Sequence, residues 1–191
     1  MSAENLEVMW SPWEGPGLEH LRLRVGEGGI EADGIVVGQE GGSTFRARYV
    51  VRCDRSWRTR ELILDPLDGS DPLHLRSSGE GDWRDASGRA LAELRGCIDV
   101  DLSATPFTNT LPIRRLDLKE GESSEIAVVY VSVPSMRRDA SVQRYTCLER
   151  NPDGGLYRYE DEGVFEGFTA DLPVDAGGLV LDYPGIFRRM S

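Results

Sequence analysis

The residues of this chain whose side chains are best suited to catalysis, ligand binding or ion pairing lie in the segment 99–116, DVDLSATPFTNTLPIRRL. Asp99 and Asp101 are two residues apart, so on an extended strand both carboxylates point to the same face. Two such acids can divide general acid and general base roles, as carboxylates do in glycoside hydrolysis. The spacing also suits ion pairing, because the guanidiniums of Arg114 and Arg115 are costly to bury without acids. We predict that one acid pairs with one arginine, with ligand contact and catalysis as the alternatives.

No complete catalytic or cofactor-binding pattern occurs elsewhere in the sequence. The serine hydrolase motif G-x-S-x-G, the dinucleotide fingerprint G-x-G-x-x-G and the phosphate loop G-K-[ST] are all missing. The histidines and cysteines are too scattered for a zinc site or a disulfide framework, and we expect the thiols to be reduced and buried. These residues are His20, His74, Cys53, Cys97 and Cys147. We therefore assign no catalytic residue, no metal ligand and no cofactor, and we expect a protein that is not an enzyme.

Arginines stand beside aromatic residues at several places on strand-like runs. A flat ring can cover the apolar C–H face of a sugar, while a neighbouring guanidinium holds its hydroxyls or a phosphate. The alternative is that each arginine lies on the solvated face of a strand whose aromatic neighbour belongs to the core. The candidate ligand contacts that this pattern provides are Arg48, Trp57, Arg58, Tyr145 and Tyr159.

The charge of the chain limits its partners. The 191 residues include 22 Lys and Arg against 33 Asp and Glu, a formal net charge of −11. This charge argues against nucleic acid as a partner and against electrostatic attachment to anionic lipid. No apolar run is long enough to span a bilayer, so we expect no integral membrane segment. Residues 1–10 lack the basic start and apolar core of a signal peptide, and we expect a cytoplasmic protein.

Glycine and proline interrupt the sequence at short intervals, and runs of strand length lie between them. Apolar and basic residues alternate over 45–53, which predicts a half-buried strand. The run 126–133, IAVVYVSV, is apolar on both faces and should be central in a sheet. One helix is expected within 108–118, with Pro112 in its first turn. About a dozen strands and one helix predict a mostly β protein, an antiparallel sheet curled into a barrel, sandwich or roll, with 1–191 as a single domain.

Long motifs, unusual in combination, are spread over most of the chain. They are DVDLSATPFTNTLPIRRL at 99–116, CDRSWRTR at 53–60, GDWRD at 81–85, LRGCIDVDL at 94–102, QRYT at 143–146, YRYE at 157–160 and VDAGGLVLDYPGIFRR at 174–189. In these motifs the chain resembles a bacterial family called putative glycolipid-binding. The resemblance implies a spiral β-roll, in which a long, mainly antiparallel sheet winds around a single helix, and it suggests a homodimer. The motif residues that would serve folding or ligand binding are Trp57, Arg58, Asp99, Asp101, Asn109, Arg114 and Arg115.

The resemblance and the residue patterns together predict a non-enzymatic binding or carrier protein for a glycolipid or related amphiphile. One alternative is a hydrolase of carbohydrates or lipids that uses Asp99 and Asp101. Another is a dimeric interaction module without a small ligand. The interior of the protein discriminates among the three: an apolar cavity favours the carrier, paired carboxylates in a cleft favour the enzyme, and a solid core favours the module.

Overall fold

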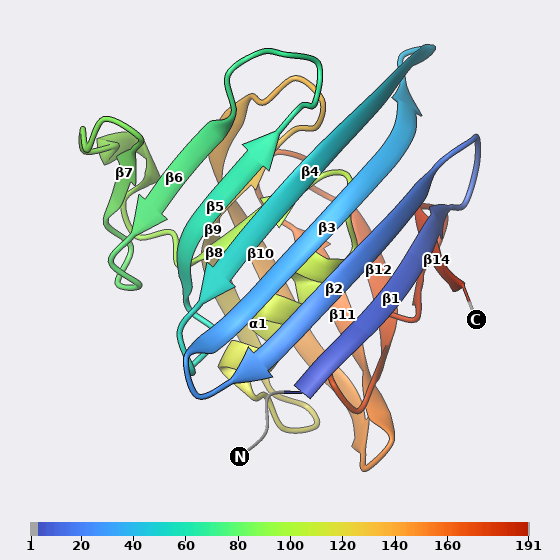
Figure 1. The fold of residues 1–191 in the computed structure, drawn as a ribbon. Helices are drawn as coiled ribbons and strands as arrows, with labels where there is room; N and C mark the ends of the chain where they lie inside the picture. Colours follow the sequence, from blue (N-terminus) through green and yellow to red (C-terminus); the bar gives the residue numbers. More distant parts are fainter. Residues whose placement is uncertain (1–3, 191) are drawn as a thin grey trace.

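The computed structural model describes residues 4–190, which form two β-sheets and one α-helix (Figure 1). The larger sheet has the order β13 (Asp182–Tyr183), β14 (Phe187–Met190), β1 (Glu4–Pro12), β2 (Leu18–Gly26), β3 (Gly29–Glu40), β4 (Ser43–Cys53), β5 (Thr59–Asp65), β6 (Leu73–Ser77), β7 (Trp83–Asp85). The smaller sheet has the order β12 (Thr169–Asp175), β11 (Gly154–Asp161), β10 (Arg138–Asn151), β9 (Ser123–Val131), β8 (Asp99–Leu102). The paired strands run antiparallel except for β8 and β9, which are parallel. The expected mostly β roll, with a long antiparallel sheet, is confirmed.

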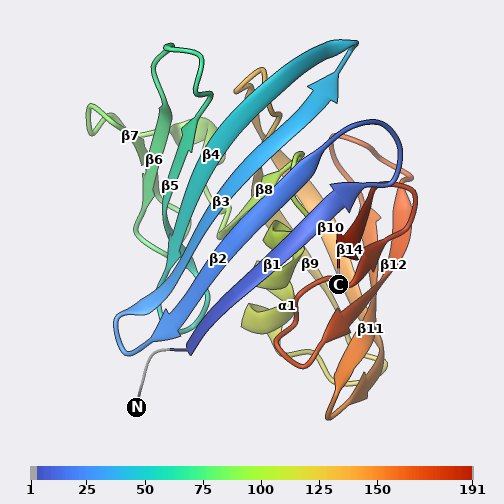
Figure 2. The same cartoon turned by 45° about the vertical axis from the view of Figure 1, so that its right-hand side comes forward.

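The helix α1 (Thr110–Leu116) lies between the two sheets, with the long strands of the larger sheet in front and β9 to β12 behind (Figures 1 and 2). A 3-10 turn, η2 (Phe107–Asn109), leads into it, and a second one, η1 (Ala92–Leu94), precedes β8. Pro112 is the third residue of α1, in the first turn, where its missing N–H removes no helical bond. The helix predicted within 108–118 is thus confirmed.

The hydrophobic core has two parts that meet at α1. Phe107 and Leu111 pack into the cluster formed mainly by the inner face of the larger sheet. Ile113 and Leu118 pack into the second cluster, formed mainly by the smaller sheet. A short helix with apolar side chains on opposite sides can bury both, because each sheet offers it an apolar face.

The predicted strand patterns hold in the structure. In β4, Ala47, Tyr49 and Val51 are buried, whereas Arg48 and Arg52 are exposed on the outer face. The run 126–133 supplies most of β9, which has a hydrogen-bonded neighbour on each side and buries four consecutive residues at its end. The β4 pattern follows from the period of two, since side chains alternate between the faces of a strand. The continuous burial at the end of β9 shows instead that both faces of this central strand are covered.

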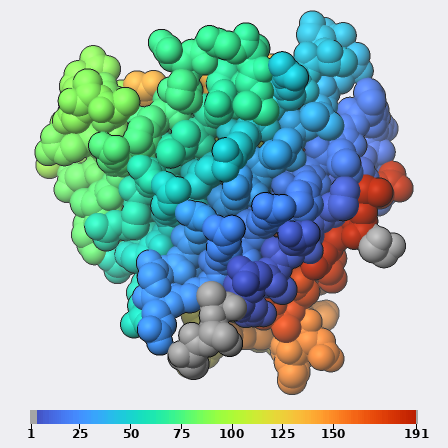
Figure 3. All heavy atoms as spheres, viewed as in Figure 1, coloured from blue at the N-terminus to red at the C-terminus, as the bar shows by residue number. Residues whose placement is uncertain are grey.

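The outer face of the larger sheet, seen in Figure 3, runs from β1 to β5 across the front of the molecule. All three cysteines, Cys53, Cys97 and Cys147, are buried and unbonded, as predicted. Within residues 4–190, none of the helices is long and apolar enough to cross a bilayer.

Candidate binding cleft

Asp99 at the start of β8 is paired with Arg115 of α1. Arg115 donates from Nη2 to Oδ2 of Asp99 at 2.6 Å and from Nε to both carboxylate oxygens at 3.1 Å. The carboxylate is fully buried and the guanidinium is 15% exposed. Burial raises the pKa of Asp99, and the Arg115 guanidinium opposes that rise. The predicted ion pair is therefore present, and it joins the smaller sheet to the helix.

Asp101 leaves the same face of β8 but has different partners. It accepts hydrogen bonds from the Thr108 hydroxyl at 3.0 Å and from the Gln143 amide at 2.6 Å. Burial raises its pKa, while the bonds from Gln143 and Thr108 lower it. Unlike Asp99, it lines a hollow, so the two acids that share a face do not share an environment.

Two adjoining hollows, of about 440 and 390 Å³, form one cleft between strands β1 to β4 of the larger sheet and the smaller sheet. Trp10, Val36 and Phe45 line the first hollow, and Asp101, Asn109 and Tyr159 line the second. The residues that line both are Ser103, Tyr130, Phe165, Ile186 and Phe187. We call the two hollows together the cleft.

Aromatic rings form the rim of the cleft. Phe165 and Phe168 belong to the loop between β11 and β12 and are 53% and 37% exposed. Phe165 packs edge-on against Tyr130, with ring centroids 5.5 Å apart. The Asp161 carboxylate holds this loop, because its Oδ1 accepts the backbone N–H groups of Gly163 at 2.8 Å and Phe165 at 3.0 Å. Fixed, exposed rings beside a hollow are typical of a surface that contacts an apolar ligand.

Below the rim, the second hollow has a polar floor. The Tyr159 hydroxyl donates to Oδ2 of Asp161 at 3.0 Å, and the Tyr145 hydroxyl donates to Oδ1 of Asn109 at 2.8 Å. The two tyrosine rings meet edge to face at 5.4 Å. Burial is the main cause that raises the pKa of both tyrosines, which keeps them neutral. Asn109 and Tyr159 line the hollow directly, whereas Tyr145 supports Asn109 from behind.

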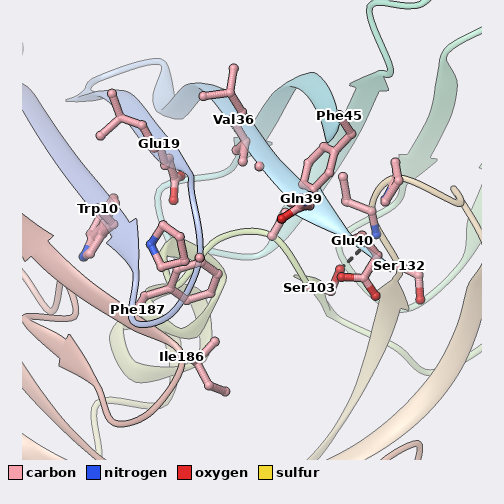
Figure 4. A pocket seen from close by; sticks show the side chains of 18 of the residues that line it. Trp10, Glu19, Val36, Gln39, Glu40, Phe45, Ser103, Ser132, Ile186 and Phe187 are labelled. Atoms are coloured by element: carbon pink, nitrogen blue, oxygen red, sulfur yellow. Dashed lines mark hydrogen bonds between the residues drawn. The ribbon is translucent and has the colours of Figure 1, made fainter. Parts of the chain in front are cut away.

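Glu19 of β2 lines the first hollow and was not predicted from the sequence. Its Oε1 accepts hydrogen bonds from the Tyr49 hydroxyl at 2.5 Å and the Thr105 hydroxyl at 2.6 Å. Burial raises its pKa to about 7, although both bonds lower it. Its other oxygen, Oε2, is buried and has no hydrogen-bond partner among residues 4–190. Figure 4 shows its side chain at the same hollow as the rings of Trp10, Phe45 and Phe187.

The sequence carries a signal for Glu19. Leu21 and Leu23 alternate with basic residues, and two positions earlier the same alternation puts Glu19 on the buried face of β2. An acid at an inward-facing strand position is a candidate functional group, because burying it without a cation is costly.

The other sequence-predicted contacts lie away from the cleft. Arg48 is on the outer face of the larger sheet, where its guanidinium donates two hydrogen bonds of 2.8 Å to Asp33. Arg58 pairs with the exposed Glu80. Buried Trp57 lies under the guanidinium of Arg114, which is 5.3 Å from the ring centroid.

Of the ten predicted ligand contacts, the cleft therefore brings together Asp101, Asn109 and Tyr159, with Tyr145 behind them. Arg48, Trp57, Arg58, Asp99, Arg114 and Arg115 line neither hollow. A role for these six in binding stays a prediction. In the described part of the chain, no group of three or more His, Cys, Asp or Glu residues could hold a metal ion.

Comparison with known proteins agrees with this architecture. Residues 7–189 match the model of a family described as "Putative glycolipid-binding". A crystal structure of a DUF1089 family protein from Pseudomonas aeruginosa is 36% identical in sequence and superposes with a TM-score of 0.79. That similarity covers 93% of this chain and 95% of the other. The search of curated proteins found no match.

Proposed function

This chain belongs to the "Putative glycolipid-binding" family, and from that premise we propose that it binds a glycolipid or a related amphiphile in the cleft as a carrier, without altering it chemically. The observation that carries the proposal is the division of the cleft into an aromatic rim and a polar floor. An amphiphile has the same division, so both of its parts find matching surroundings.

The apolar part of the ligand would lie against the rim. Phe165 and Phe168 expose their rings there, and Tyr130 and Phe187 extend the same surface into the hollows. Each methylene group that such a surface removes from water contributes about 0.8 kcal/mol. A short alkyl chain therefore supplies several kcal/mol without any specific polar contact.

The headgroup would contact the floor. Asp101 and Asn109 lie there with Tyr159, which burial keeps neutral. Such groups form hydrogen bonds to hydroxyls, and hydrogen bonding is what fixes the orientation of a ligand in a mostly apolar pocket.

The hydrolase alternative requires two carboxylates free to act on one bond. Asp99 is enclosed and bound to Arg115, so only Asp101 of the predicted pair lines the cleft. This geometry favours ion pairing over catalysis for Asp99. Hydrolysis of the bound ligand would support the alternative.

We also propose that the protein is a cytoplasmic homodimer. The family resemblance is one support for the dimer. A second is a set of three exposed apolar side chains on the outer face of the larger sheet, Met190, Met9 and Ile35, which the strand register aligns in one row with His20 between Met9 and Ile35. Apolar rows on an open sheet commonly pack against another protein surface.

Native mass spectrometry of protein purified from its own host tests the binding proposal, because a retained lipid is weighed directly. Titration with decyl β-D-glucoside below its micelle concentration then compares the wild type with Phe165→Ala and Phe168→Ala. We expect each variant to bind several-fold more weakly, since each loses apolar contact area. Met190→Ala, which removes an exposed apolar side chain from the outer face, is the matched control and should bind like the wild type. Absence of binding by the wild type, or recovery of hydrolysed glucoside, would overturn the proposal.

A further inference from the structure

We infer that Glu19 is a specificity residue of the cleft, and that its free carboxyl oxygen Oε2 binds a hydroxyl group of a neutral, sugar-like headgroup in the first hollow. This inference rests on the proposed function, because it names the headgroup class that the cleft accepts. It adds a residue outside the segment 99–116 and outside the motifs quoted for the family resemblance.

Only one of the two carboxyl oxygens of Glu19 has hydrogen-bond partners among residues 4–190. Both of its protein hydrogen bonds, from Tyr49 and Thr105, end on Oε1. Its Oε2 is buried without a partner among residues 4–190, although Glu19 lines the hollow. A buried polar atom without a partner is costly, and such atoms in native proteins have a specific reason. A ligand hydroxyl can supply the missing hydrogen bond.

The groups that hold Glu19 are themselves fixed. Tyr49 is fully packed, and its ring stacks on Phe107 with centroids 6.4 Å apart and planes at 13°. The backbone of Gly34 lies directly across the ring, where a Cβ atom would come within 2.2 Å of it. The Thr105 hydroxyl also accepts the Phe107 N–H at 3.0 Å. Glu19 is therefore a preorganised polar group, and binding need not order it.

The lining of the cleft selects a neutral headgroup. No Arg or Lys among residues 4–190 lines either hollow. The acids that do are Glu14 and Glu40 beside the first hollow, Asp101 and Asp161 beside the second, and Glu19 itself. A phosphate or carboxylate would meet these acids with no cation to compensate, and its desolvation would not be repaid. A hydroxyl carries no charge and can either donate a hydrogen bond to Oε2 or accept one from it when the carboxyl is protonated.

A pair of matched ligands tests the inference. Decyl β-D-glucoside carries four free hydroxyls, and its tetra-O-methyl derivative keeps the ring and the alkyl chain but has no hydroxyl donor. We expect the wild type to bind the glucoside at least about tenfold more tightly, which corresponds to one well-formed hydrogen bond to a carboxyl group. Glu19→Leu should bind both ligands with the affinity that the wild type has for the methylated one. Glu19→Gln, whose amide both donates and accepts, should keep most of the preference.

A second measurement avoids any dependence on the folding of Glu19→Leu. In wild-type protein with 13C-labelled glutamate, the side-chain carboxyl resonance of Glu19 should move on addition of the glucoside and stay in place with the methylated derivative. If the wild type binds both ligands equally, or if Glu19→Leu keeps the preference, Oε2 makes no hydrogen bond to the headgroup, and the inference is wrong while the proposed function stands. If the wild type binds neither ligand, both are overturned.

Discussion

Arg115 and Asp99 form a buried ion pair in which Nη2 of the guanidinium lies 2.6 Å from Oδ2 of the carboxylate. The pair connects the end of α1 to the start of β8, and the enclosed carboxylate has no other charged partner among the described residues. Removal of the Asp99 carboxylate would leave the Arg115 guanidinium, which is only 15% exposed, without a counter-charge. The pair therefore fixes the helix against the smaller sheet.

Asp99→Ala should consequently lower the free energy of unfolding by roughly 3 to 5 kcal/mol, the cost of breaking a buried pair from one side. Asp171→Ala is the matched control, because Asp171 pairs with Arg158 on the surface, where both side chains are more than 40% exposed. That variant should lose about 1 kcal/mol or less. Urea denaturation of both variants measures the difference. A loss well under 1 kcal/mol for Asp99→Ala would contradict the structural role.

The pKa of Glu19 predicts a pH dependence of stability. In the folded protein burial raises this pKa to about 7 from its ordinary value of 4.5. Between these two pH values the unfolded chain has lost the proton and the folded chain keeps it, so the free energy of unfolding falls as pH rises. Across this pH range, the titration of the fully buried Glu19 should lower the free energy of unfolding by about 3 kcal/mol.

Urea denaturation of the wild type and Glu19→Gln at several pH values isolates this contribution, because other groups titrate alike in both proteins. Relative to Glu19→Gln, the wild type should lose stability from pH 4.5 to 7 and no more above that range. Parallel pH profiles for the two proteins would show that Glu19 titrates normally.

The close approach of Gly34 to Tyr49 predicts a sharp effect of one methyl group. A Cβ atom at Gly34 would lie 2.2 Å from the ring, so Gly34→Ala must displace Tyr49 or bend β3. We expect a loss of about 1 to 3 kcal/mol from overpacking. Gly28→Ala is the control, since no atom lies within 4 Å of its Cβ position, and it should change stability by less than about 0.5 kcal/mol. Equal stability of the two variants in thermal unfolding would rule out the tight packing.

The sequence predicts the fold better than it predicts the cleft. Strand alternation in 45–53 and the proline in the first turn of α1 are local signals, and the structure follows both. The pairing of Asp99 with Arg115 was also predictable, because only 16 residues separate them and a buried guanidinium needs an acid. Interactions between residues that are near in the sequence determine these features.

The assembly of the cleft depends on contacts between distant parts of the chain. Glu19 has its partners 30 and 86 residues away, at Tyr49 and Thr105, and no local pattern places them together. The alternation that identifies Arg48 as facing away from Tyr49 does not indicate which face meets a ligand. On the outer face, the Arg48 guanidinium is hydrogen-bonded to Asp33, which is 15 residues away on the neighbouring strand. Register and sheet packing therefore determine which of the predicted contacts can reach a ligand.

The last prediction concerns the homodimer. Ile35, Met9 and Met190 are 48%, 36% and 48% exposed on the outer face of the larger sheet, and the strand register puts them in one row. If a second copy covers this row, light scattering across a micromolar dilution series should give the mass of a dimer. Ile35→Asp should shift the mass towards the monomer, because the interface would then bury an unpaired charge.

Val164→Asp supplies the matched control for that shift. Val164 is 42% exposed, but it lies on the loop between β11 and β12, away from the larger sheet. The control should therefore keep the mass of the wild type. A wild-type protein that is monomeric at every micromolar concentration would remove the dimer prediction. A dimer that Ile35→Asp leaves intact would place the interface on another surface, such as an unpaired edge of one of the sheets.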